Sequence, residues 1–361
     1  MSYITSIGYS VPEYELGQED VKSFIKHVFP KTERDINRLL PVFENASVDT
    51  RQFVKPMEWF AKDHTFKERN DIYEEQSLFH SLIAIDTCLQ NKMMFDETVP
   101  YEAIDMIIYV SSTGIATPTI DARIINERDF RDDIKRMPLW GLGCAGGGTG
   151  LSRAMEFVRT YKDKNVLLVC VELCSLTFQK NDNRKSNFIG TALFGDGISA
   201  ALIMGEQSPY LSRVKRTIPY MTRSSSKLLK DALDVMGWNV NEDGLQVIFA
   251  RSIPTLVETF WREHVEGFME ELGDNPKDYP FLVAHPGGKK VLEAYQDVLQ
   301  CGEDKFLHSY DVLREHGNMS SATVLHVLKR WMEQQQPSGT KSILAALGPG
   351  FSSELIRLEW S

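Results

Sequence analysis

The sequence is poor in cysteine, has no long apolar run and carries no excess of positive charge. Of 361 residues only five are cysteine, and the longest clearly apolar run, residues 166–171, is six residues long. A membrane-spanning helix needs about 20 apolar residues, so we expect no membrane span. Forty Lys and Arg residues face fifty Asp and Glu residues, which gives a net charge of −10. This balance argues against nucleic acid as a partner and against broad binding to an anionic membrane.

The cysteines are odd in number and scattered, at Cys88, Cys144, Cys170, Cys174 and Cys301. That pattern is typical of reduced thiols and not of a disulfide framework. No histidine or second cysteine pair stands near Cys170 and Cys174 at ligand spacing, so we expect no metal site. The first fifteen residues carry no positive charge and no sustained apolar core, unlike a secretory signal. We therefore expect a cytoplasmic protein.

Short apolar strands alternate with amphipathic stretches along the chain, which predicts an α/β fold with largely buried sheets. At about 150 residues per domain, the length predicts two to three domains or one large duplicated unit. Residues 57–75 are rich in charged and aromatic side chains without clean periodicity, and we interpret them as a surface excursion or irregular helix without a chemical role. The predicted strands are residues 104–110, 166–171, 198–204, 281–284, 342–346 and 354–358.

The two halves of the sequence resemble each other when they are shifted by about 173 residues. Residues 105–114 and 278–287 each form an apolar run that opens into a turn. Cys144 and Asn318 then fall at nearly equivalent places, each before apolar residues with helical spacing. The alternative is that two α/β stretches look alike by chance. If a pseudo-twofold axis relates the halves, Cys144, His285 and Asn318 can all face one central crevice.

Cys144 lies in a run of small residues between Gly141 and Gly150, directly before a predicted helix. The helix dipole can lower the pKa of such a thiol, and flanking glycines let a substrate carbonyl approach backbone N–H groups. These are the requirements of a nucleophile that accepts an acyl group. One alternative is a buried structural cysteine. Another is a dinucleotide-binding turn, because Gly141 to Gly146 matches G-x-G-x-x-G, although residues 132–140 before it do not form a convincing buried strand.

His285 and Asn318 complement this thiol. His285 ends an apolar strand before a Pro-Gly-Gly turn, and such a histidine can pair with a thiolate and donate to an oxyanion. Asn318 stands at a helix start, where a plain N-cap is the alternative. Because an asparagine amide donates hydrogen bonds without losing a proton, His285 and Asn318 can hold an enolate while Cys144 carries an acyl group. The set favours decarboxylative carbon–carbon bond formation.

Four segments together resemble the signature segments of type III polyketide synthases, the chalcone and stilbene synthase family. They are Gly143-Cys144-Ala-Gly-Gly, Leu193-Phe194-Gly-Asp-Gly197, Ala284-His285-Pro-Gly-Gly and Gly317-Asn318-Met-Ser-Ser. The resemblance runs from about Ile4 to Leu358, and residues 172–178 are similar to bacterial alkylpyrone synthases. It implies a thiolase fold, with two βαβαβαββ halves at residues 1–206 and 207–361 in a five-layered αβαβα arrangement. It also implies a homodimer.

The resemblance further implies the roles of individual residues. Cys144 would take the starter acyl group from an acyl-CoA, while His285 and Asn318 would promote decarboxylation of malonyl-CoA. No cofactor is implied, because coenzyme A thioesters are the substrates. Phe194 would be a gatekeeper between channel and cavity, and Val247 falls near a second gatekeeper position, with Phe249 as the alternative. The other positions that match the cavity or its side tunnel are Thr113, Cys174, Thr177, Gly190 and Ser320.

Small residues at these positions would admit a long acyl chain, so we predict a medium- or long-chain fatty acyl-CoA starter. Residues 346–350 resemble the family's Gly-Phe-Gly-Pro-Gly loop but lack its first glycine and its phenylalanine. The cations that would bind coenzyme A match less well, and the candidates are Arg38, Lys55, Lys289 and Lys290. Three other functions remain open: a ketoacyl-ACP synthase III that performs one condensation, a non-catalytic dinucleotide-binding protein, and a papain-like protease, which the missing C-G-[SA]-C-[WY] signature argues against.

Overall fold

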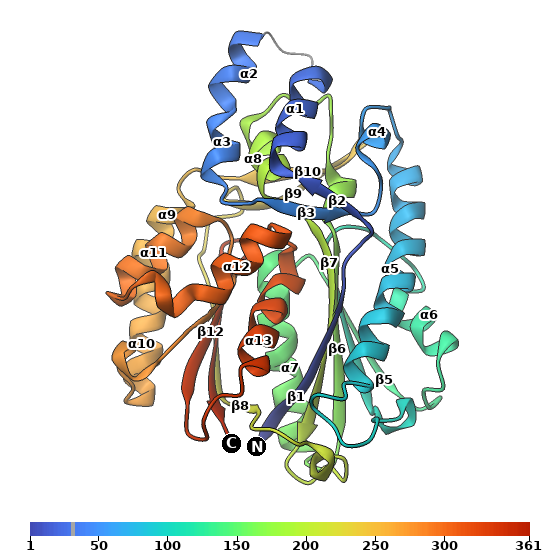
Figure 1. The fold of residues 1–361 in the computed structure, drawn as a ribbon, viewed down its shortest axis with the longest axis vertical. Helices are drawn as coiled ribbons and strands as arrows, with labels where there is room; N and C mark the ends of the chain where they lie inside the picture. The colour runs from blue at the N-terminus through green and yellow to red at the C-terminus, as the bar shows by residue number, and fades with distance from the viewer. Residues whose placement is uncertain (30–32) are drawn as a thin grey trace.

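The computed structural model describes residues 1–29 and 33–361 and contains one nine-stranded sheet. Its strand order is β11-β12-β13-β8-β1-β7-β6-β4-β5. The strands are β1 (Ser2–Ser10), β4 (Met106–Ser111), β5 (Lys135–Trp140), β6 (Asn165–Leu173), β7 (Asp196–Gly205), β8 (Pro219–Leu228), β11 (Val283–Ala284), β12 (Lys341–Gly348) and β13 (Ser352–Trp360). Only the pairs Ser2–Met221 and Tyr3–Tyr220 join β1 to β8. The sheet therefore consists of two halves that meet near the chain termini (Figure 1).

The two halves have the same strand order and the same strand directions. In the first half β4 and β6 are parallel, and β6, β7 and β1 follow in antiparallel pairs. In the second half β11 and β12 are parallel, and β12, β13 and β8 follow in antiparallel pairs. The first half adds β5 as an extra edge strand next to β4. This correspondence confirms the duplication that the internal repeat predicted.

Two helices form the layer between the halves of the sheet. Helix α7 (Gly146–Thr160) contacts β4, β6 and β7 on one side and β12 and β13 on the other. Helix α13 (Thr323–Glu333) packs beside α7 and contacts β1, β7, β11 and β12. The glycines of the α7 segment permit this close packing, because a Cβ at Gly147 would lie 2.4 Å from the Ser321 carbonyl oxygen and one at Gly150 would lie 2.5 Å from Leu168.

Other helices cover the outer faces (Figure 1). Helices α5 (Phe66–Leu89) and α6 (Ile120–Glu127) contact the first half of the sheet. The second half is covered by α9 (Ile253–Leu256), α10 (Arg262–Leu272), α11 (Lys289–Leu299) and α12 (Leu307–His316). The layers are therefore helix, sheet, helix, sheet and helix, which confirms the predicted five-layered thiolase fold. Strand β6 is buried along its whole length, as expected for an apolar strand covered on both faces.

A smaller group of elements closes one end of the sheet, where β4 and β6 end and β7 begins (Figure 1). Strands β2 (Tyr14–Gly17) and β3 (Thr50–Phe53) pair there, as do the hairpin strands β9 (Met236–Asn241) and β10 (Gly244–Phe249). The helices in this region are α1 (Gln18–Val28), α2 (Glu33–Leu39), α3 (Pro41–Asn45), α4 (Met57–Phe60) and α8 (Lys185–Leu193). Short 3₁₀ turns are η1 (Tyr101–Ala103), η2 (Gly143–Ala145), η3 (Cys174–Thr177), η4 (Leu211–Arg213), η6 (Pro276–Asp278), η7 (Glu303–Phe306) and η8 (Ser320–Ala322), and η5 (Val257–Trp261) is a π-helical turn.

All six predicted strands are present, but one interpretation needs correction. Residues 57–75 are not a surface excursion, because they contain α4 and the start of the regular 24-residue helix α5. A capping box between Thr65 and Glu68 begins α5, and this Thr-x-x-Glu signal is visible in the sequence. Residues 135–140 do form a strand, β5, but it lies at the sheet edge and is largely exposed, so it lacks the apolar signal of a buried strand.

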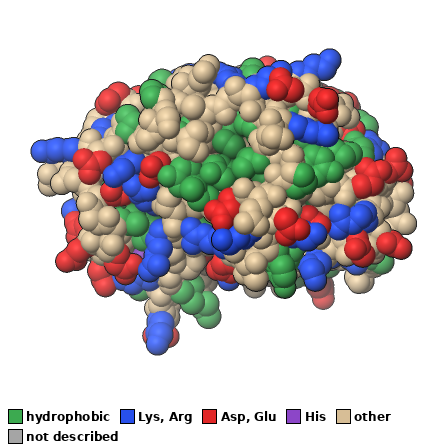
Figure 2. Space-filling view, turned by 90° about the horizontal axis from the view of Figure 1, so that it is seen from below, with side chains coloured by type: hydrophobic (Ala, Val, Ile, Leu, Met, Phe, Trp, Pro, Cys, Tyr) green, Lys and Arg blue, Asp and Glu red, His purple; other side chains and the backbone are tan. Residues whose placement is uncertain are grey.

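The five cysteines are all free, as predicted. Among the described residues, no helix is long and apolar enough to cross a membrane. The face that carries the chain termini shows Lys and Arg interspersed with Asp and Glu around apolar side chains (Figure 2). On this face, therefore, neither sign of charge forms a continuous field.

Candidate active site

Cys144 lies in η2, directly before α7, and the turn around it is fixed by contacts from both halves. The backbone N–H of Gly143 donates to Ser112 Oγ at 2.8 Å, and Ser112 follows β4. Gly143 has a φ of 47°, and a Cβ on it would lie 2.6 Å from the ring of Pro349. Only glycine fits here, because the backbone is left-handed and the proline ring occupies the side-chain position.

Burial disfavours the thiolate form of Cys144 in the chain by itself. The side chain is 7% exposed, and burial raises its pKa to about 12, with the nearby Glu172 carboxyl adding to the shift. The helix dipole was expected to lower this pKa, and that expectation is wrong for the chain by itself because desolvation outweighs it. Cys144 Sγ donates to Asn318 Oδ1 at 3.7 Å. The thiol therefore becomes a nucleophile only when a base accepts its proton.

Asn318 is held with its amide nitrogen available. It follows α12 and Gly317, and the backbone N–H of Ser320 donates to its Oδ1 at 2.8 Å. Because the oxygen accepts this bond and the Cys144 bond, the other end of the amide must be Nδ2. Nδ2 is buried and has no hydrogen-bond partner among the described residues. A donor in this state is suited to stabilise a negative oxygen that enters the site.

His285 directly follows β11 and is 2% exposed. Its backbone N–H donates to the Ala345 carbonyl of β12 at 2.8 Å. Strand β12 ends at Gly348, where a Cβ would lie 2.6 Å from Ala145 Cβ, so the end of β12 packs on the Cys144 turn. Neither ring nitrogen of His285 has a partner among the described residues, and burial lowers its pKa to about 3. The imidazole is therefore neutral and can accept a proton as well as donate one.

Glu172 connects the turns of the two halves, and the sequence analysis did not single it out as a functional residue. Its carboxylate accepts the Ser112 N–H at 3.1 Å and the Ser321 hydroxyl at 2.6 Å. Ser112 holds the Cys144 turn, and Ser321 lies in η8 beside Asn318. The side chain is fully buried, and this raises its pKa to about 7. A charged residue at the end of an apolar strand is the sequence signal that identifies it.

Phe194 is linked to Asn318 through the backbone. The Asn318 N–H donates to the Leu193 carbonyl at 2.7 Å, and the Gly195 N–H donates to the Asn318 carbonyl at 3.1 Å. The Phe194 ring lies 6.1 Å from the ring of Trp238, which comes from β9. The predicted gatekeeper therefore stands between Asn318 and the β9–β10 hairpin.

Two adjoining cavities meet at Cys174, Phe194 and Val247. The first, which we call the thiol cavity, is lined by Gly143, Cys144, Cys174, Phe194, Met236, Gly237, Trp238, Val247, Ile248, Phe249, Ser320 and Pro349. The second, the apolar cavity, is lined by Val21, Phe24, Phe53, Met57, Phe60, Cys174, Ser175, Thr177, Phe178, Asn187, Gly190, Thr191, Phe194 and Val247. Each encloses about 30 Å³, room for only about two water-sized spheres.

Most predicted cavity residues are where they were expected. Ser320 lines the thiol cavity, and Thr177 and Gly190 line the apolar one. Val247 and Phe249 both face the thiol cavity, but only Val247 belongs to both. Thr113 lines neither cavity, because its hydroxyl accepts the Leu173 N–H at 2.9 Å. Among the lining residues that no motif predicted are the apolar side chains Phe24, Phe53, Met57, Phe60 and Trp238.

The four candidate cations for coenzyme A lie apart from both cavity linings. Arg38 is exposed on α2, and Lys55 is half-buried after β3. Lys289 and Lys290 are exposed at the start of α11, and Lys289 lies 3.8 Å from Glu293. Their role in binding coenzyme A stays a prediction. The residues that the structure describes include no group of His, Cys, Asp and Glu suited to a metal ion.

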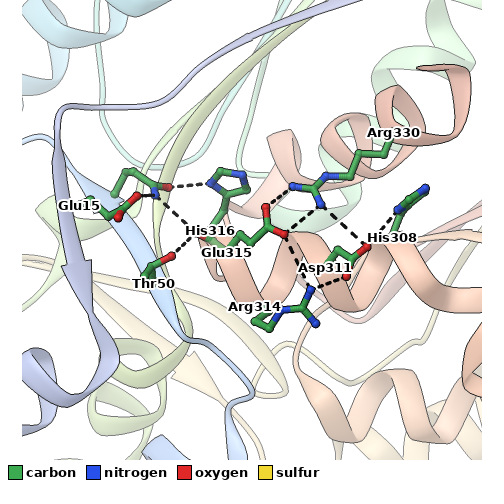
Figure 3. A network of polar contacts seen from close by, with 9 residues as sticks. Glu15, Thr50, His308, Asp311, Arg314, Glu315, His316 and Arg330 are labelled. Atoms are coloured by element: carbon green, nitrogen blue, oxygen red, sulfur yellow. Dashed lines mark hydrogen bonds and ion pairs between the residues drawn. The ribbon is translucent and has the colours of Figure 1, made fainter. Parts of the chain in front are cut away.

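A polar network supports the segment before Asn318 (Figure 3). His316 Nδ1 and Gln52 Oε1 are 2.7 Å apart, and Thr50 donates to the Glu315 carbonyl at 2.9 Å. The Glu315 carboxylate accepts from Arg330 of α13 at 2.5 Å. The network therefore ties the β2–β3 sheet to α12 and α13, on either side of the Gly317–Asn318 turn.

The start of α7 has no room for a dinucleotide, so the dinucleotide-binding alternative is wrong. The G-x-G-x-x-G turn does follow a strand, β5, and does precede α7. However, a Cβ at Gly146 would lie 2.5 Å from Val110 and 3.1 Å from Ser321, and Pro349 covers Gly143. Because the second half of the chain packs on this helix start, no pyrophosphate can reach it.

Comparison with known proteins agrees with this geometry. Models of the chalcone and stilbene synthases match residues 3–208 with their N-terminal domain and residues 221–359 with their C-terminal domain. A putative chalcone synthase of Bacillus subtilis (strain 168) is 45% identical over 361 residues, which cover 100% of this chain and 99% of the relative. A 1,3,6,8-tetrahydroxynaphthalene synthase of Streptomyces peucetius subsp. caesius is 31% identical, with 99% and 93% covered.

A solved structure shows the same fold. The crystal structure of 1,3,6,8-tetrahydroxynaphthalene synthase from Streptomyces coelicolor A3(2), a bacterial type III polyketide synthase, superposes with a TM-score of 0.91 at 28% identity and covers 99% of each chain. The fold, both family models and these relatives exclude a papain-like protease and a dinucleotide-binding protein. The chain therefore belongs to the chalcone and stilbene synthase family and is a type III polyketide synthase, a decarboxylating acyltransferase that uses coenzyme A thioesters.

Proposed function

We propose that this enzyme loads a medium- or long-chain fatty acyl group from acyl-CoA onto Cys144 and extends it with malonyl-CoA to products of the alkylpyrone or alkylresorcinol type. The observation that carries the proposal is the apolar cavity next to the thiol cavity, with aromatic and aliphatic side chains from α1, β3, α4 and β10. An alkyl chain attached to Cys144 can enter it past Phe194 and Val247, which belong to both linings.

Loading requires that the Cys144 thiol loses its proton, because burial favours the neutral thiol. His285 accepts the thiol proton while Cys144 Sγ forms a bond with the thioester carbonyl carbon. The negative oxygen that develops accepts a hydrogen bond from Asn318 Nδ2, which has no partner among the described residues. The carbon–sulfur bond to coenzyme A then breaks, and the departing thiolate takes a proton. Cys144 is left as the acyl thioester.

Extension uses the same donors. Loss of CO₂ from malonyl-CoA leaves its electron pair as an enolate, whose oxygen Asn318 Nδ2 and a protonated nitrogen of His285 stabilise. The enolate carbon attacks the acyl carbonyl, a carbon–carbon bond forms, and the Cys144 thiolate leaves. The extended chain is then on coenzyme A and can be returned to Cys144. The buried position of all three side chains keeps water from competing.

The apolar cavity must widen to hold a chain, because it encloses only about 30 Å³. Met57 is the flexible member of the lining, with an unbranched side chain that can change rotamer, and Phe24 and Phe60 lie on the short helices of the closing region. Each methylene that is buried there contributes roughly 0.8 kcal/mol, so affinity should rise with chain length until the cavity is full.

Product analysis tests the proposal. The enzyme is incubated with malonyl-CoA and, in turn, acetyl-, hexanoyl-, decanoyl-, palmitoyl- and benzoyl-CoA, and the products are identified by mass spectrometry with Cys144→Ala as the blank. We expect repeated extension of the decanoyl and palmitoyl starters without a carrier protein. Extension of benzoyl-CoA with rejection of the longer acyl chains would contradict the proposed starter. A single condensation that needs a carrier protein would favour the ketoacyl-ACP synthase III reaction instead.

We also propose a homodimer that resides in the cytoplasm. The outer edge of β5 has no strand partner among the described residues, and Trp140 on it is 51% exposed beside Ile115 at 46%. An exposed edge with apolar side chains is suited to pair with a second copy. Sedimentation equilibrium should give twice the chain mass of 41.1 kDa. The reduced state of the five cysteines fits a cytoplasmic enzyme.

A further inference from the structure

Arg51 on β3 is fully buried, yet no carboxylate of the described residues forms an ion pair with it. Burial alone lowers the pKa of the guanidinium, to about 9, so it still carries its charge at neutral pH. An unpaired buried charge is costly unless other groups solvate it. Its retention in the core therefore calls for a specific set of acceptors.

Those acceptors are backbone carbonyls at the end of α8. Arg51 Nη1 donates to the Thr191 carbonyl at 2.6 Å and to the Phe194 carbonyl at 3.3 Å. The last carbonyls of a helix lack partners within the helix and carry the negative end of its dipole. Arg51 thus caps the C-terminus of α8 from a strand about 140 residues earlier in the chain.

The capped segment leads directly into Phe194, the residue between the two cavities. Two other contacts hold the same segment. The backbone of Asn318 pairs with Leu193 and Gly195, and a Cβ on Gly195 would lie 2.2 Å from the His316 carbonyl oxygen. That Cβ would also lie 3.2 Å from Arg51 Cβ, so the segment is enclosed on both sides. A change at the cap therefore acts directly on the segment that carries Phe194.

We propose that Arg51 is a positioning residue that fixes the Phe194 backbone and, through the Phe194 ring, sets the selectivity for the starter acyl group. Arg51 lines neither cavity, so it acts through the backbone segment that it caps, which carries Thr191 and Phe194 of the apolar lining. This inference rests on the proposed passage of the acyl chain past Phe194. A lysine at position 51 keeps the charge and its N–H donors but lacks the rigid planar guanidinium, so it should restore only part of the effect.

The test compares four variants, Arg51→Met, Arg51→Lys, Phe194→Ala and the double variant Arg51→Met/Phe194→Ala. For each, kcat/KM is measured with acetyl-, hexanoyl- and decanoyl-CoA, and the thermal midpoint is recorded. We expect Arg51→Met to change the decanoyl-to-acetyl ratio by about tenfold in the same direction as Phe194→Ala. The double variant should match Phe194→Ala in that ratio, because both changes act through one side chain. Arg51→Lys should fall between Arg51→Met and the wild type.

Arg159→Met is the matched control. Arg159 of α7 also donates to two backbone carbonyls, those of Met221 and Thr222, at 3.1 and 2.6 Å, but at the other end of the sheet. Its loss should lower stability and leave the starter ratio unchanged. The proposal is overturned if Arg51→Met slows all starters equally, or if its effect and that of Phe194→Ala on the ratio multiply.

If Arg51→Met does not fold, Arg51→Lys is the variant that tests the proposal. An unchanged decanoyl-to-acetyl ratio of kcat/KM in Arg51→Lys would then overturn it. The failure of the fatty acyl proposal looks different. The wild-type enzyme would then not extend decanoyl-CoA, and the ratio would be measured between two starters that it does accept.

Discussion

The ends of β4 and β11 occupy equivalent places in the two halves of the sheet, yet they serve different purposes. With the shift of about 173 residues, Ser112 after β4 corresponds to His285 after β11. Ser112 is fully engaged, since its N–H donates to Glu172 and its hydroxyl accepts the Gly143 N–H. The ring nitrogens of His285 have no partner among the described residues. One strand end therefore holds the site in place, and the other presents a reactive group.

In the turns that carry Cys144 and Asn318, each half supplies a different chemical group. In the first half η2 carries the Cys144 thiol, and in the second half Asn318, directly before η8, carries an amide whose oxygen is fixed by Ser320. The same local geometry thus offers a nucleophile from one half and an oxyanion donor from the other. A duplicated fold can divide one reaction in this way because each half needs to supply only part of the site.

Removal of Cys144 should distinguish most strongly between the contributions of the two halves to the reaction. In Cys144→Ala, condensation should fall by more than about a thousandfold, because no acyl thioester can form. Decarboxylation of malonyl-CoA should persist within about tenfold, because Asn318 and His285 still hold the enolate. Release of ¹⁴CO₂ and product formation are measured in parallel, with Cys301→Ala as a control thiol. An equal fall in both rates would show that the halves do not act separately.

Removal of the Asn318 amide should have the converse effect. In Asn318→Ala, decarboxylation should slow by about 10²–10³-fold, the usual cost of losing one oxyanion donor. Loading of Cys144 should also slow, because Asn318 Nδ2 is the donor that we assign to its oxyanion, but it should slow less if His285 accepts the thiol proton as proposed. Intact-mass measurement of the acyl-enzyme and CO₂ release distinguish the two steps. Asn275→Ala, at the start of η6, is the control, and loss of loading with intact decarboxylation would contradict the assignment.

A side chain at Gly190 should block the apolar cavity, which is built mainly by the first half. A Cβ there would lie 3.2 Å from the Phe194 ring and 3.5 Å from Val247. Gly190→Leu should reduce kcat/KM for decanoyl-CoA by about 10- to 100-fold and change that for acetyl-CoA little. Gly267→Leu is the matched control, since nothing lies within 4 Å of a Cβ at Gly267. Equal loss with both starters would place the acyl chain elsewhere.

Substitution of Glu172, which joins the two halves, should have the smallest effect, and that effect is on the stability of the fold. Burial raises its pKa from 4.5 to about 7, so the folded state holds a proton that the unfolded chain loses. Its contribution is complete below pH 4.5 and is lost as the pH rises through about 7. In Glu172→Gln, the decline of the unfolding free energy between pH 5 and 8 should shrink by about 1–3 kcal/mol.

Denaturant unfolding at a series of pH values measures this decline. Glu315→Gln is the control of opposite sign, because the Arg330 guanidinium lowers the pKa of Glu315 and its contribution is lost only as the pH falls. Identical pH slopes in Glu172→Gln and the wild type would show that Glu172 stays ionised in the fold.

The sequence was sufficient for the elements with strong local signals. Six apolar strands, the duplication and the three reactive side chains follow from apolar runs and short motifs, because these signals are local. Strand β1 was not predicted, since its serines and glycine give a weak apolar pattern although seven of its nine residues are buried. The apolar cavity was missed in part, because Phe24, Phe53, Met57 and Phe60 lie on three separate elements with no common motif.

The sequence by itself determined the fold class, the family and the identity of the thiol, imidazole and amide, because residue type and spacing encode them. Only the tertiary structure decided the pKa shifts and the orientation of these side chains. The pKa of Cys144 rises and that of His285 falls because both are desolvated, and desolvation depends on what packs around a residue. The direction of the Asn318 amide, the bridge through Glu172 and the cap of Arg51 on α8 are likewise contacts between distant segments. Only the folded chain brings these segments together.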